Sequence, residues 1–139
     1  MKFSFQIEKT ELGVVVKPLY SSDQEQLSKL KQNTNYVGSI KQDRNNKFTR
    51  KAFALVGLGY DNQEEYNNFE AYRYILTIEA GFYKEYNISM GKLQIADSWS
   101  EEETDQIKME EIFNGILRVL VNKLESAPAI IKEQLEHYM

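Results

Sequence analysis

The sequence predicts an α+β fold, in which a small antiparallel sheet of about four strands is flanked by about five helices. Early and late in the chain, apolar residues alternate with polar ones, which is the period of a half-buried strand. Longer stretches repeat apolar residues every three or four positions, as amphipathic helices do. Strands placed early and late, with helices between them, are typical of an α+β domain. At 139 residues, we expect one domain spanning residues 1–139.

Four segments have the character of strands. Residues 3–7 alternate apolar and polar side chains, and residues 14–16 are three valines that follow a glycine and precede a proline. These two segments are predicted to form a hairpin. Residues 36–41 are predicted as a third strand, and residues 92–99, with apolar residues at alternate positions, as the fourth.

Five helices are predicted, and several carry a recognisable start or stop signal. The segment Ser22–Glu25 has the pattern of a capping box. Asn68 is predicted to cap a helix that stops at Gly81, because glycine favours helix ends. Met109–Leu124 has the clearest helical stripe of apolar residues in the chain. The predicted helices begin near Ser22, Asn46, Asn68, Met109 and Ser126.

The composition excludes several classes of function. Without cysteine, the chain has no disulfide, zinc–cysteine site or thiol nucleophile, and this suits a cytoplasmic location. The alternating N-terminus is not a signal peptide, and no apolar window is long enough to cross a membrane. No glycine-rich phosphate loop, serine elbow or metal-protease motif is present. We therefore expect no catalytic residue, no metal and no cofactor, and we expect that the protein is not an enzyme.

A basic segment stands out in a chain whose net charge is -4. Five cations fall between residues 41 and 51, and those at 47, 50 and 51 share one helical face. Cations at a helix N-terminus are unfavourable, and a phosphate would relieve this by meeting both the cations and the free amides. Tyr36 precedes the segment and is the candidate for stacking on a base. The predicted nucleic-acid contacts are Tyr36, Lys41, Arg44, Asn45, Lys47, Arg50 and Lys51.

Two alternatives to nucleic-acid binding stay open at this stage. The cations are either solvated or paired with Glu101–Glu103, which belong to the acidic run Glu101, Glu102, Glu103 and Asp105. We interpret this run mainly as the approach to the helix near Met109, because negative charge suits a helix N-terminus. It also offers a surface for a protein partner, so the alternative function is a protein–protein interaction module such as an inhibitor of a host defence system.

The segment Arg44–Tyr60, of sequence RNNKFTRKAFALVGLGY, resembles a phage-encoded family of unknown function. That family carries an Arg-Asn-Pro-x-Phe-His-Arg-Lys-x-Phe-Ala-Leu-type segment, and the chain departs from it at Asn46 and Thr49. Residues 109–113 and the apolar helix after them are similar to the family's C-terminal part. The resemblance covers roughly residues 10–125.

The same segment more distantly resembles the lambdoid-phage recombination-mediator family, Orf or NinB. Its members are dimers that bind single-stranded DNA and interact with single-strand-binding protein. The resemblance implies that Arg44, Asn45, Arg50 and Lys51 contact the strand. We therefore expect a homodimeric phage accessory protein of the host cytoplasm that binds single-stranded nucleic acid in recombination or replication.

Overall fold

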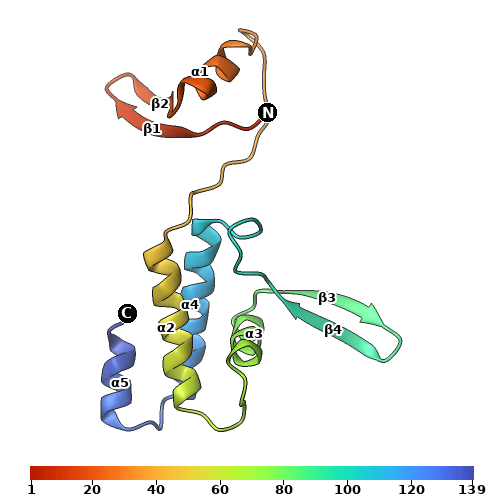
Figure 1. Cartoon of the computed structure of the whole chain (residues 1–139), viewed down its shortest axis with the longest axis vertical. Helices are drawn as coiled ribbons and strands as arrows, with labels where there is room; N and C mark the ends of the chain where they lie inside the picture. Colours follow the sequence, from red (N-terminus) through yellow and green to blue (C-terminus); the bar gives the residue numbers. More distant parts are fainter. The chain divides into compact units, whose positions relative to one another are not determined.

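The computed structural model describes all 139 residues and confirms the α+β class, with five helices and four strands. The strands do not join in one sheet. They form two separate antiparallel hairpins, β1–β2 and β3–β4 (Figure 1). The chain divides into two compact units, Met1–Ser39 and Ile40–Met139, which are described in turn. One domain over residues 1–139 stays a prediction.

The first unit consists of β1 (Phe5–Thr10), β2 (Gly13–Pro18) and α1 (Ser21–Ser28). The predicted hairpin is confirmed, and its turn ends at Gly13, whose φ of 125° suits glycine. The predicted capping box is wrong. The N-cap is Tyr20, two residues before Ser22, and no side chain caps the helix. Ser22 therefore lies inside the first turn.

The first unit has no apolar core. Its one buried residue is Asp23, while the large apolar side chains of β2 are exposed by about half or more. Domains near or below about 40 residues seldom bury enough apolar surface to be stable alone. The unit spans residues 1–39, so its own contacts supply little of the stability that it needs.

The second unit holds the main core. It contains α2 (Asn46–Asp61), α3 (Phe69–Glu79), β3 (Tyr83–Ile88), β4 (Gly91–Ala96), α4 (Gln106–Lys123) and α5 (Ala129–Glu136). The predicted helix signals are confirmed at Asn68, whose side chain accepts from the amide of Ala71, and at Gly81, whose φ is 96°. Three helices, α2, α3 and α4, supply most of the buried apolar side chains, and Trp99 joins them from the segment that follows β4.

Two strand predictions differ from the structure. Residues 36–41 have no strand partner and are exposed. The alternation predicted there cannot form a strand alone, because a strand needs a neighbour for its backbone hydrogen bonds. The missed strand is Tyr83–Ile88, which pairs with β4 across a short turn ending at Gly91. All of its residues are exposed, so burial imposed no clear pattern on its sequence.

The three core helices approach closely at Gly59. A methyl group on this residue would lie 2.6 Å from Leu120 Cδ2 and 2.7 Å from the hydroxyl of Tyr72, both side chains of the core. Gly57, in the same helix, has open space around the corresponding position. Glycine at residue 59 is therefore a packing requirement, whereas glycine at residue 57 is not.

We predict that Gly59→Ala lowers the free energy of unfolding by about 1–3 kcal/mol, because the core has no room for the added methyl group. The matched control, Gly57→Ala, should raise it by up to about 1 kcal/mol through the better helix propensity of alanine. Urea denaturation followed by circular dichroism measures both changes. Equal effects of the two substitutions would contradict this packing.

Candidate nucleic-acid interface

Arg44 is a structural residue in the second unit. Its Nη1 donates to the carbonyl oxygens of Trp99 at 2.8 Å and Thr104 at 2.9 Å, and its Nη2 donates to Thr49 Oγ1 at 2.9 Å. The residues between β4 and α4 form no strand, so several of their carbonyls need such a donor. The prediction that Arg44 contacts phosphate is therefore corrected, since its guanidinium joins the start of α2 to the segment before α4.

Asn45 is the N-cap of α2. Its side-chain oxygen accepts from the amides of Lys47 at 3.0 Å and Phe48 at 3.2 Å. Its own amide donates to Gln106 Oε1 at 2.8 Å, which ties α2 to α4. We expected phosphate to meet free amides at this helix start. The structure corrects this point, because the Asn45 side chain already occupies two of them.

The remaining cations form an exposed set that we call the basic face: Lys41, Lys47, Arg50 and Lys51. The last three lie on one side of α2, as their three- and four-residue spacings require. The ammonium of Lys51 lies 5.1 Å from the ring centre of Phe113, so its stem packs on α4 while the residue stays exposed. None of the five ion pairs in the structure includes a member of the basic face.

The acidic run separates into two parts. Glu101, Glu102 and Glu103 form an exposed turn without ion pairs, so the predicted pairing with the basic face is absent. Asp105 is the N-cap of α4, where it accepts from the amide of Lys108 at 2.9 Å, and it also accepts from the amide of Gln42. The role expected for negative charge ahead of this helix is thereby confirmed for Asp105. Its carboxylate is engaged in hydrogen bonds within the fold, so only Glu101–Glu103 remain as the predicted partner surface.

The tyrosines divide between the core and the surface. Tyr60, Tyr66 and Tyr72 pack with the core, and burial raises the pKa of Tyr72 to about 12, with a smaller contribution from the charge of Glu79. Tyr74, Tyr83 and Tyr86 are exposed. Tyr36 is also exposed, but it belongs to the first unit and its hydroxyl accepts from the amide of Lys31. Its role in stacking on a base stays a prediction.

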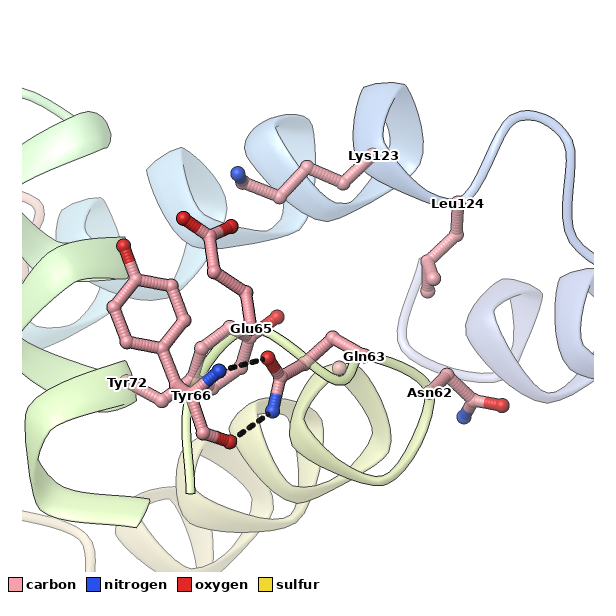
Figure 2. Close-up of a pocket in the computed structure, with 8 residues that line it drawn as sticks. Asn62, Gln63, Glu65, Tyr66, Tyr72, Lys123 and Leu124 are labelled. Carbon is pink, nitrogen blue, oxygen red and sulfur yellow. Dashed lines mark hydrogen bonds between the residues drawn. The ribbon is translucent and has the colours of Figure 1, made fainter. Parts of the chain in front are cut away.

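A hollow near the end of α2 is too small to hold a ligand. Figure 2 shows Gln63 between the residues that line it, with its amide group bonded to both the backbone N–H and the carbonyl of Tyr66 at 2.7 Å. The hollow measures about 80 Å³, well below the roughly 300 Å³ at which ligand pockets begin. Its polar groups stabilise the turn between α2 and α3.

A second pocket, which the sequence did not reveal, opens beside α3 and the end of β4. We call it the aromatic pocket; it measures about 330 Å³ and is lined by Arg73, Tyr74, Ile95, Ala96, Ser98 and Trp99. The guanidinium of Arg73 lies 4.8 Å from the ring centre of Tyr74 and 5.0 Å from that of Trp99. The lone tryptophan at a strand end was the one available signal, and it did not show which residues surround it.

Comparisons with known protein families, curated proteins and solved structures found no match to this chain. The resemblance to phage-encoded families therefore stays a prediction. No three His, Asp or Glu side chains converge to hold a metal ion. Every helix is too short or too polar to cross a bilayer.

We predict that Arg44→Ala lowers the free energy of unfolding by about 2–4 kcal/mol, because it removes several charged hydrogen bonds to backbone carbonyls. Lys47→Ala removes an exposed cation of the same segment and should change stability by less than about 0.5 kcal/mol. Chemical denaturation measures both. An Arg44→Ala variant as stable as Lys47→Ala would show that the guanidinium does not hold this end of the fold.

Proposed function

We propose that the protein binds single-stranded nucleic acid through the basic face, as an accessory protein of phage recombination or replication. One observation carries the proposal: Lys47, Arg50 and Lys51 lie exposed on one side of α2, Lys41 precedes them in the chain, and none of the four has a carboxylate partner in a chain of net charge -4. Unpaired cations gathered on one face attract phosphates, and they also set the register of a bound strand.

The geometry favours a flexible strand over a long duplex. Lys47 and Lys51 are one helical turn apart, which is about 6 Å along the axis, so α2 presents its cations over a short distance. A single strand can bend to bring successive phosphates to such a small face. A rigid duplex would extend past it and meet a surface of net negative charge, which opposes binding.

Reversing two charges of the basic face should weaken this binding strongly. We predict that Arg50→Glu with Lys51→Glu weakens binding of labelled oligothymidylate at least tenfold. Parent binding should weaken with salt at about 0.7 log units per phosphate contact per log unit of salt, so four contacts at about 0.7 each give a slope near 2.8. Fluorescence anisotropy at several salt concentrations measures both quantities.

The matched control reverses two exposed cations elsewhere in the second unit, Arg118 and Lys132, to Glu. Like the test variant, it reverses one arginine and one lysine, so both variants change the net charge equally. Neither Arg118 nor Lys132 forms an ion pair, so the control breaks none. Its affinity for oligothymidylate should be within about threefold of the parent's, because charges far from the basic face act on the strand only at long range, where salt screens them. Equal losses in both double variants would mean that net charge, and not the basic face, controls binding.

A second candidate function rests on the acidic turn Glu101–Glu103. These three carboxylates are exposed and unpaired, as the surface of a module that docks on a basic protein would be. The turn lies at the same end of the unit as the start of α2, because Arg44 bonds to Thr104 just beyond it. Its charge therefore acts against phosphate bound at the basic face.

Neutralising this turn separates the two functions. We predict that Glu101→Gln with Glu102→Gln and Glu103→Gln strengthens oligothymidylate binding at low salt about two- to fivefold, because it removes nearby like charge to the phosphates. The gain should vanish at high salt, where the Debye length is only about 3 Å. Unchanged binding at low salt, with loss of a protein partner in pulldown, would support the second candidate.

A further inference from the structure

The aromatic pocket is built around a buried cation. Arg73 is 8% exposed, and its guanidinium lies against three rings. Besides Tyr74 and Trp99, it contacts Phe53, whose ring centre lies 5.5 Å away. Its one hydrogen bond runs from Nη2 to Glu70 at 2.8 Å, and this hydrogen bond and charge lower the pKa of Glu70. The Nε of Arg73 is buried without a partner. Such an unmade hydrogen bond is costly, and Arg44 Nε is another atom of this kind in the structure.

The pocket has a fixed wall. The Nε1 of Trp99 donates to Thr77 Oγ1 at 3.2 Å, and that hydroxyl donates to the carbonyl of Arg73 at 2.8 Å. Trp99 is itself buried, while Tyr74 on the rim is 46% exposed. Trp99 and Arg73 are therefore already held in place on this side of the pocket, which lowers the cost of binding.

One face of the β3–β4 hairpin continues the pocket outward. In the strand register, Tyr86 lies opposite Leu93 and Lys84 opposite Ile95, and these pairs share a face because strand side chains alternate. Ile95 also lines the aromatic pocket. Ile88 extends this apolar face toward the turn, and the face contains no carboxylate. Its single charge is the unpaired Lys84.

The pocket also adjoins the basic face. Phe53 packs on Trp99 with ring centres 5.1 Å apart, and it follows Arg50 by three residues on α2. Residues three apart on a helix are neighbours, so Arg50 and the pocket lie on either side of Phe53. A strand held by its phosphates on α2 is within reach of the pocket.

We propose that the aromatic pocket and the Tyr86 face of the β3–β4 hairpin hold bases of the strand whose phosphates lie on the basic face, with Tyr74 and Tyr86 as stacking platforms. The inference rests on the proposed function. Charge and ring chemistry favour this occupant, because the one free charge of the surface, Lys84, is positive and the rings of Tyr74 and Tyr86 are exposed. Successive bases stack on such rings beside cations that contact the backbone, without regard to sequence.

The experiment compares oligothymidylate with an abasic oligonucleotide of equal length, which offers the same phosphates without bases. Trp99 is the only tryptophan and lines the pocket, so its emission reports directly on occupancy. Oligothymidylate should change this emission and bind at least about fivefold more tightly than the abasic strand, as stacked bases do. The abasic strand should bind with little change in emission.

Tyrosine variants place the bases on the surface. Tyr74→Ala and Tyr86→Ala should each weaken oligothymidylate binding about fivefold or more and leave abasic binding unchanged. The control is Gln94→Ala, because Gln94 is exposed on the opposite face of the same hairpin, where it pairs with Glu85, and it does not line the pocket. It should bind oligothymidylate as the parent does.

Three results would overturn the inference, and they are distinguishable. In the first, binding depends on the basic face but is equal for both oligonucleotides and for all tyrosine variants. This result excludes base binding at the pocket and leaves the proposed function intact. No binding of either strand by the parent removes both. A dimer that Tyr86→Ala dissociates, with oligothymidylate binding unchanged, shows that the hairpin face is a contact between two copies of the chain.

Discussion

The position of Arg44 is the constraint on which the functional surface depends. Its guanidinium donates to carbonyls of the segment between β4 and α4. The side chain of Gln106 accepts a hydrogen bond from the backbone amide of the next residue, Asn45. These bonds fix the start of α2 against the start of α4. Because one side of α2 is buried against the core, the helix then turns Lys47 and Arg50 outward. A residue that we expected to contact phosphate instead positions those that remain available.

Charge and packing therefore have separate roles within one short segment. Arg44 and Asn45 satisfy backbone groups, while Lys47, Arg50 and Lys51 are left exposed at a helix start whose dipole does not favour them. The same core places Trp99 and Arg73 on the other side of Phe53. The basic face and the aromatic pocket thus adjoin without any added element.

The helices could be predicted from the sequence because a buried stripe such as Met109–Leu124 repeats at the helical period, and caps such as Asn68 act locally. The strand Tyr83–Ile88 could not, because both its faces are exposed and packing left no clear alternation. The cations at 47, 50 and 51 were correctly placed on one face by spacing alone. The inward turn of Arg44 depends on carbonyls some 55 residues away, which no local pattern reveals.

The most direct test of the basic face is amide chemical-shift mapping by NMR, with the full chain titrated with oligothymidylate at low salt. We expect saturable shifts along the exposed side of α2 at Lys47, Arg50 and Lys51, while the Arg44 Nε–H resonance stays unchanged. Shifts confined to Glu101–Glu103, or none at concentrations where the oligonucleotide is in excess, would contradict the account.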